Sequence, residues 1–142
     1  MSPKDLEAAT SEFIQAVGLL VRRVRSAAAS EALSMTESSV LSRLEKHGPA
    51  TIADLARAEV MKPQSMGATI STLEEMGLVE RNPHPTDGRQ MHIALTPGGL
   101  ALRKATHAAK RSWLTQAIAQ LDNAERETLF KAGEIALRLA EK

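Results

Sequence analysis

Apolar residues recur at helical spacing over long stretches at both ends of the chain. In the N-terminal stretch, residues 5–29, the recurring positions are Leu6, Phe13, Val17, Leu20 and Val24. Because every third or fourth residue of a helix points to the same side, this pattern predicts one long amphipathic helix. Two further helices are predicted after residue 96, a long one that begins at Pro97 and a last one that begins near Asp122.

Between residues 34 and 96 the predicted helices and strands are shorter, and the boundaries between them coincide with capping or turn signals. A Ser or Thr followed three residues later by an acid, the spacing of a capping box, precedes helices predicted over 36–47 and 51–59. Pro63 fits the first turn of a third helix, which ends before Gly77, and an extended segment follows. The order of helix, short helix, helix, strand, wing and strand is typical of a winged helix-turn-helix.

Residues 86–96 are interpreted as the wing. Asp87-Gly88 is a tight-turn signal, because glycine adopts a positive φ without steric cost, and alternating apolar residues over 91–95 predict the strand that follows. Arg89 lies beside the turn, where a long cation would project from the body of the protein and could enter a groove of DNA. An ordinary solvated hairpin is the alternative interpretation.

The predicted fold is mainly α with a small β-wing: a winged helix-turn-helix flanked by N- and C-terminal dimerisation helices. We expect one structural domain with an N-terminal helix over 1–30, a DNA-binding lobe over 34–96 and C-terminal helices over 97–142. The terminal helices are too apolar along one face to stand alone, so they predict a homodimer. Completion of a monomeric core is the alternative.

The composition argues against several classes of protein. The 18 Lys and Arg residues are balanced by 17 Asp and Glu residues, so DNA binding must depend on local pattern rather than on bulk charge. Without cysteine, the chain forms no disulfide, thiolate zinc site or thiol switch. With two Phe, one Trp and no Tyr, it lacks the stacking platforms of single-strand binders, which leaves duplex DNA as the expected nucleic acid.

No cofactor and no metal site are predicted, because the four histidines lack ligand spacing. The sequence also contains no nucleophile elbow, phosphate loop or metal signature that would indicate an enzyme. Its first residues include acids and no continuous apolar segment, which argues against a signal peptide or a membrane span. A cytoplasmic protein without a membrane partner is therefore expected.

The wing carries the pattern Asp-x-Arg, three residues, then Ile-x-Leu-Thr, which stands here as Asp87, Arg89, Ile93, Leu95 and Thr96. With GPATIADLA at 48–56 and LEEMGLVER at 73–81, the chain resembles the MarR family of bacterial transcription regulators. The resemblance implies a winged-helix homodimer, usually a repressor and often released from DNA by a small ligand. It also implies that Arg89 inserts into the minor groove.

The N-terminal half of the helix predicted from Pro63 is the candidate recognition surface, because groove-reading helices present their first turns to base edges. Residues 61–73 contain no acid, although residues 36–96 as a whole carry more acids than bases. The candidate DNA contacts are Lys62, Pro63, Gln64, Ser65, Met66, Thr69, Arg81, His84 and Arg89. Asp87 and Gly88 are expected to shape the wing. A polar, solvated helix face is the alternative, and His84 is equally well explained as a surface histidine.

By analogy with the family, a ligand pocket is expected between the first two helices, the long fifth helix and the lobe. Its candidate lining is Phe13, Val17, Val24, Met35 and Val40, which would suit a small apolar or weakly acidic ligand. Ordinary core packing is the alternative for these residues. The predicted function is a ligand-responsive repressor that binds double-stranded DNA at a two-fold symmetric operator; the alternative is a winged-helix protein-interaction module without DNA readout.

Overall fold

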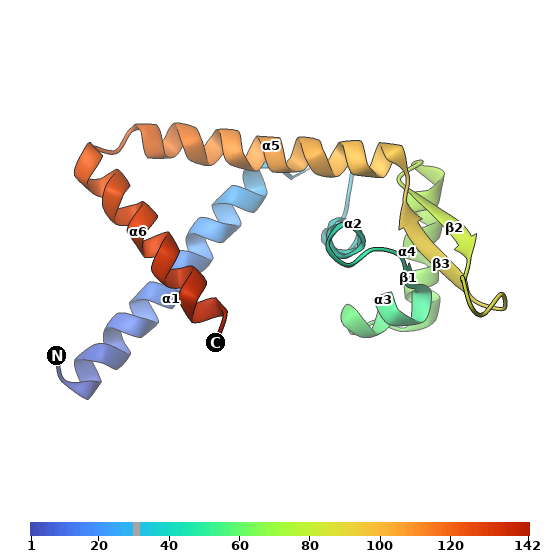
Figure 1. Ribbon diagram of the computed structural model, residues 1–142, viewed down its shortest axis with the longest axis horizontal. Coiled ribbons are helices and arrows are strands. Elements are labelled where there is room, and N and C mark those ends of the chain that lie inside the picture. Colours follow the sequence, from blue (N-terminus) through green and yellow to red (C-terminus); the bar gives the residue numbers. More distant parts are fainter. Residues whose placement is uncertain (30–31) are drawn as a thin grey trace. The chain divides into compact units, whose positions relative to one another are not determined.

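The computed structural model describes residues 1–29 and 32–142. These residues form six helices and three strands, in agreement with the predicted mainly α fold with a small β-wing (Figure 1). The elements are α1 (Pro3–Ala27), α2 (Met35–His47), β1 (Ala50–Thr51), α3 (Ile52–Ala58), α4 (Pro63–Glu75), β2 (Val79–Pro83), β3 (Met91–Leu95), α5 (Pro97–Ala119) and α6 (Asn123–Ala140). Among the described residues, no helix combines the length and the apolar composition needed to cross a membrane.

The chain divides into two compact units. The winged unit is Ala29–His107, and the helical unit combines Met1–Ala28 with Ala108–Lys142. The sequence analysis placed the lobe over residues 34–96 of one structural domain. The winged unit extends further because the first turns of α5 pack on it: Arg103 is buried there and forms an ion pair with Glu45 of α2.

The winged unit contains an antiparallel sheet in the order β1-β3-β2. Val79 of β2 pairs with Leu95 of β3, and the ladder continues to Pro83 opposite Met91. On the other side of β3, the two residues of β1 pair with Ile93 and His92. The sequence analysis did not predict β1, because two residues are too few to show an alternating pattern.

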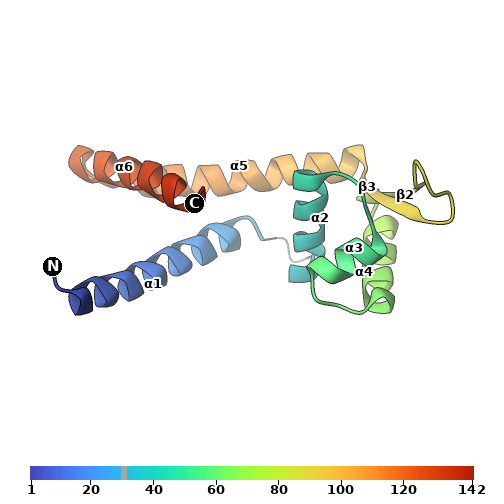
Figure 2. The same cartoon turned by 60° about the horizontal axis from the view of Figure 1, so that its bottom comes forward.

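The core of the winged unit is contributed by α2, α3, α4 and the sheet, which Figure 2 shows gathered together. Its buried members are Val40, Leu41, Leu44, Leu55, Ala56, Met66, Ile70, Leu73, Val79 and Ile93. The expectation that Met66 contacts DNA is wrong, because its side chain is 0% exposed. Met66 lies on the same face of α4 as Ile70 and Leu73, four and seven residues further along, and that face points inward.

Glycine is required where α4 ends and where α5 begins. Gly77 has φ +77° at the end of α4, where Leu78 N–H donates to Leu73 O and closes the helix in a Schellman motif. At Gly99, a Cβ would lie 2.2 Å from the carbonyl oxygen of Leu78. The missing side chain of Gly99 therefore lets α5 approach the backbone at residue 78.

The helical unit leaves its apolar faces uncovered within one chain. Neither α1 nor α6 contains a buried residue. The exposed large apolar side chains of these two helices include Leu6, Phe13, Ile14, Val17, Leu20, Phe130, Ile135 and Leu139. Within this unit, the guanidinium of Arg23 lies over the ring of Trp113, 5.1 Å from its centroid. Two long amphipathic helices with exposed apolar faces form a larger apolar surface than a soluble monomer ordinarily leaves exposed.

Candidate nucleic-acid interface

The helix α4 presents its first two turns to solvent on the side opposite the core. Lys62 is its N-cap residue and Pro63 begins the helix, while Gln64, Ser65 and Ala68 are exposed. Thr69 is half-buried, and its hydroxyl donates to the carbonyl oxygen of Ser65. With Met66 turned inward, the exposed face of α4 presents Gln64 and Ser65, whose polar groups are able to hydrogen-bond to base edges.

The N-terminus of α4 lacks the side-chain cap that other helices have. Capping boxes close α1, α2, α3 and α6, and Thr96 Oγ1 accepts the N–H of Gly99 at the start of α5. Lys62 makes no such capping bond. The first N–H groups of α4 therefore have no side-chain acceptor among the described residues, and the positive end of the helix dipole is exposed there.

Arg81 is held against the C-terminal half of α4. Its Nε lies 3.3 Å from Oε1 of Glu74, and its Nη2 donates to Oγ of Ser71 at 3.1 Å. The side chain is half-buried. Of the candidate DNA contacts, Arg81 is therefore the one whose guanidinium is most occupied within the protein, joining β2 to α4.

The wing differs in shape from the tight turn that the sequence predicts. The strands end at Pro83 and resume at Met91, so residues 84–90 form a longer loop. Gly88 does not have a positive φ; within the described residues, positive φ angles occur at Gly48, Gly77 and Val60. Pro85 explains why the strand pairing stops, because proline has no N–H to donate to the ladder.

The wing loop is organised around the imidazole of His84. The N–H groups of Thr86 and Asp87 both point at His84 Nδ1, each at 3.1 Å. The loop is closed by the N–H of His84, which donates to the carbonyl oxygen of Gln90 at 3.0 Å. The ring of His92 lies beside that of His84, with 4.3 Å between centroids.

Arg89 is the most exposed of the candidate contacts in the wing. Its backbone N–H donates to Oδ1 of Asp87 at 3.1 Å, and its Nε lies 3.3 Å from the same oxygen. The side chain nevertheless remains 93% exposed. Asp87 therefore contacts the near end of the guanidinium, while the rest of that group faces solvent.

A surface groove separates the wing from the start of α3. Its lining is Thr51, Ile52, Ala53, Asp54, Arg57, Arg81, His84, Gln90 and Met91. Hydrogen bonds from Thr51 and the charge of Arg57 hold the pKa of Asp54 below its ordinary value. Arg57, which the sequence analysis did not consider as a contact, is an exposed cation of this groove. Its orientation follows from the burial of Leu55 and Ala56 on the opposite face of α3, which the short helix pattern alone does not define.

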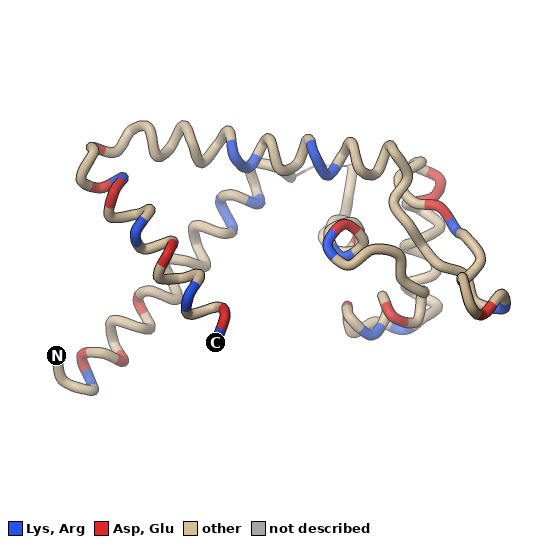
Figure 3. The backbone as a smooth tube through the Cα atoms, viewed as in Figure 1, with Lys and Arg blue, Asp and Glu red and all other residues tan. Residues whose placement is uncertain are grey.

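The charges of the winged unit are largely paired. Its arginines form the ion pairs Arg43–Glu59, Arg57–Asp54, Arg81–Glu74, Arg89–Asp87 and Arg103–Glu45. Figure 3 shows basic and acidic positions interspersed along its backbone. Each of these pairs joins one base to one acid, and none of the acids lies in segment 61–73.

The residues expected to line a ligand pocket fall into both units. Phe13, Val17 and Val24 belong to α1 in the helical unit. Met35 is an exposed residue at the start of α2, whereas Val40 is fully buried in the core of the winged unit, which contradicts its place in a pocket lining. The pocket itself remains a prediction.

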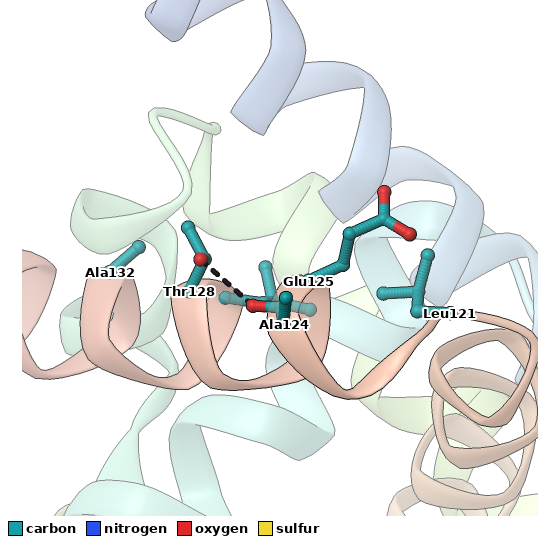
Figure 4. Close-up of a pocket in the computed structure, with 6 residues that line it drawn as sticks. Leu121, Ala124, Glu125, Thr128 and Ala132 are labelled. Carbon is teal, nitrogen blue, oxygen red and sulfur yellow. Dashed lines mark hydrogen bonds between the residues drawn. The ribbon is translucent and has the colours of Figure 1, made fainter.

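A different concavity lies along α6 in the helical unit (Figure 4). Its lining is Leu121, Ala124, Glu125, Thr128, Leu129 and Ala132. Small side chains occur there at every fourth position, and the hydroxyl of Thr128 is turned back onto the carbonyl oxygen of Ala124. This surface shares no residue with the expected ligand pocket. In the part of the chain that the structure describes, no three His, Asp or Glu side chains gather as metal ligands.

Known proteins resemble this chain in sequence over most of its length. The sequence pattern of the MarR family matches residues 33–91. An HTH-type transcriptional regulator of Mycobacterium tuberculosis (strain CDC 1551) is 36% identical over 132 residues, which cover 93% of this chain and 92% of the relative. An HTH-type transcriptional repressor of Mycobacterium tuberculosis (strain H37Rv) is 33% identical over 106 residues, covering 74% and 76%.

The fold is also found among solved structures. A mutant of MepR from S. aureus, bound to an oligodeoxyribonucleotide, superposes with a TM-score of 0.70 and 19% identity. The match covers 94% of this chain and 98% of that protein. Since the identity is low, this similarity concerns the fold alone.

Proposed function

Because this chain belongs to the MarR family and is a DNA-binding transcription regulator, we propose that it acts as a homodimeric repressor of a two-fold symmetric DNA site. The observation that carries the proposal is the start of α4: an acid-free, exposed first turn whose N–H groups lack a side-chain cap. A helix end of this kind binds anions, and a DNA phosphate is the anion that the function supplies.

The proposed contacts follow from exposure and chemistry. Lys62 and the first N–H groups of α4 bind a phosphate, which brings Gln64 and Ser65 to base edges in the major groove. Thr69 supports this surface from the next turn. Arg89 enters the minor groove, where narrow A·T-rich DNA concentrates negative potential. Arg81, whose Nη2 donates to Ser71, and His84, whose Nδ1 accepts backbone N–H groups, act through the shape of the lobe and the wing.

The homodimer is supported by the uncovered apolar faces of α1 and α6. A second copy is the partner of matching chemistry, because two-fold dimers are the commonest soluble oligomers. Such a dimer presents two copies of α4, so half-sites about one helical turn apart are expected. Repression is supported by a relative that is named as a repressor. Release by a small apolar or weakly acidic ligand is part of the same proposal.

The proposal is tested by selecting fragments of the source genome that the purified protein retains. The recovered site is then titrated in a gel-shift assay against wild-type protein and Arg89→Ala. We expect the variant to bind at least about tenfold more weakly, as loss of a charge-assisted contact of about 1.4 kcal/mol predicts. The matched control is Arg111→Ala, an exposed arginine of α5 in the helical unit.

Four results would contradict parts of the proposal. Equal affinity of Arg89→Ala and wild type would remove Arg89 from the interface. A recovered site without two-fold symmetry, or a monomer by sedimentation at the concentrations used, would exclude the dimeric readout. Benzoate, a simple weakly acidic aromatic probe, tests the ligand: if neither benzoate nor a neutral aromatic analogue lowers DNA affinity, release by this chemical class is not supported.

A further inference from the structure

The geometry of the wing loop assigns His84 a role that differs from a DNA contact. Its Nδ1 is the shared acceptor for two backbone N–H groups, those of Thr86 and Asp87, each at 3.1 Å. The hydroxyl of Thr86 also lies 3.3 Å from this nitrogen. These bonds connect the end of β2 to the residues three and two positions before Arg89.

The protonation state of Nδ1 follows from the donors. A backbone N–H can only donate, so Nδ1 must keep its lone pair and the single ring proton must be on Nε2. A second proton on the imidazole would occupy Nδ1 and leave both N–H groups without their acceptor. The two hydrogen bonds to Nδ1 are therefore compatible with neutral His84 and incompatible with the imidazolium.

Other charged and titratable groups surround this imidazole. The ring of His92 of β3 lies beside it, tilted by 58°, and Asp87 and Arg89 lie in the same loop. Arg81 of β2 lines the groove together with His84, as do Asp54 and Arg57 of α3. Both carboxylates are paired with arginines, Asp87 with Arg89 and Asp54 with Arg57, so neither is an unpaired counter-charge for an imidazolium.

We propose that His84 is the positioning residue of the wing: its neutral imidazole holds the loop that carries Arg89, and protonation at Nδ1 releases that loop and weakens DNA binding. The effect on DNA binding rests on the proposed function, whereas the effect on the loop does not. Histidine is the side chain whose charge ordinarily changes between about pH 5 and 8, and this interval sets the pH range of the test.

The sign of the pH dependence separates this role from a direct contact. A histidine that touches a phosphate gains a cation on protonation, and DNA affinity then rises as the pH falls. A histidine that must accept two N–H groups gives the opposite direction. Loss of two such bonds, each of modest net strength, corresponds to a fall of roughly tenfold in affinity if the ordered wing is required for binding.

The test compares wild type with His84→Asn and His84→Ala in the full-length protein. Asparagine offers a short amide oxygen as acceptor to the same N–H groups and does not titrate, whereas alanine offers no acceptor. DNA affinity is measured by fluorescence anisotropy from pH 8 to about pH 5.5 at constant ionic strength, because salt alone changes the affinity. His92→Phe keeps an aromatic ring beside His84 and removes the other titrating group.

We expect wild type and His92→Phe to lose about tenfold in affinity on acidification, His84→Asn to bind well with little pH dependence, and His84→Ala to bind weakly throughout. The proposal is overturned if His84→Asn keeps the wild-type pH dependence. It is also overturned if wild-type affinity rises on acidification and this rise disappears in His84→Ala.

A second measurement is independent of DNA. The amide chemical shifts of Thr86 and Asp87 in the free protein should follow the protonation of the His84 ring in wild type and stay constant in His84→Asn. If no duplex is retained at any pH while these amide shifts follow the protonation of the His84 ring, the proposed function is contradicted and the proposed role of His84 in the loop is supported. If DNA is bound and the shifts of the two amides do not change with pH, the proposal for His84 is contradicted and the proposed function is not.

Discussion

Arg103 of α5 donates from Nε to Oε1 of Glu45 in α2 at a distance of 3.0 Å, and the arginine side chain is only 7% exposed. The same carboxylate oxygen lies 2.9 Å from Nε2 of His107, one turn further along α5. Glu45 thus joins α5 to the core of the winged unit at two successive turns. A buried cation in such a place depends on its counter-charge, because it has lost most of its hydration.

Removing that counter-charge should destabilise the protein strongly. We expect Glu45→Ala to lower the free energy of unfolding by about 3 kcal/mol, since Arg103 stays buried without a partner. Urea unfolding followed by circular dichroism measures the change. The control is Arg57→Ala, which breaks an exposed pair with Asp54 and should cost less than about 1 kcal/mol. Similar losses in the two variants would show that burial does not strengthen the Glu45 pair.

The same carboxylate makes the fold sensitive to acid. The hydrogen bond with His107, followed by the bond and charge of Arg103, lowers the pKa of Glu45 below 4.5, against the opposing effect of burial. A carboxyl group whose pKa is lower in the folded state stabilises the fold above its ordinary value, and this contribution is lost as the pH falls through the folded value. The urea midpoint of wild type should therefore drop between about pH 5 and pH 3.

Glu45→Gln provides the comparison for this acid effect. It should be less stable than wild type at pH 7 and should lose less stability on acidification, because its amide does not titrate. Parallel pH profiles of the two proteins would place the acid sensitivity in other carboxylates, such as Asp54.

Gly99 and Gly67 should respond to the same substitution in opposite ways. A Cβ at Gly99 would lie 2.2 Å from the carbonyl oxygen of Leu78, so Gly99→Ala requires a backbone shift and should cost about 1–3 kcal/mol. A Cβ at Gly67 meets no atom within 4 Å, and Gly67→Ala should stabilise α4 by up to about 1 kcal/mol. Thermal unfolding of the two variants tests both signs; a stable Gly99→Ala would disprove the close approach of α5.

Val60 stands where a helix end favours glycine. It has φ +52° after α3, and Met61 N–H donates to the carbonyl oxygen of Ala56, as Leu78 does to Leu73 after α4. A β-branched residue is strained in this conformation by about 1–2 kcal/mol. Because the Val60 side chain is almost fully exposed, Val60→Gly should raise the melting temperature, whereas Val60→Ala should recover less of the strain. No gain from glycine would argue against strain at this turn.

Much of the fold follows from local signals in the sequence. Capping boxes at Ser34, Thr51 and Asp122 define where three helices begin, and Gly77 ends α4 as predicted. The periodicity that would have turned Met66 inward was also present, since it continues to Ile70 and Leu73. The extent of the winged unit was not predictable in this way, because it depends on contacts between Glu45 and a helix almost sixty residues later in the chain.

The wing shows a different limit of the sequence pattern. Asp-Gly pairs are frequent in tight hairpins, so Asp87-Gly88 favours such a turn. The loop is organised instead by the imidazole of His84, which accepts the N–H groups of Thr86 and Asp87. A surface histidine between two prolines carries no signal of that role. Pro85 was the available indication that the strand pairing could not continue into the loop.

The uncapped first turn of α4 also has a consequence for the register on DNA. A helix whose first N–H groups lack a side-chain acceptor binds an anion best when that anion lies on the helix axis. A DNA phosphate in that position would complete the helix in place of a side-chain cap. We therefore expect the backbone of DNA to act as the missing N-cap, so that Gln64 and Ser65 meet the same base pairs each time the protein binds.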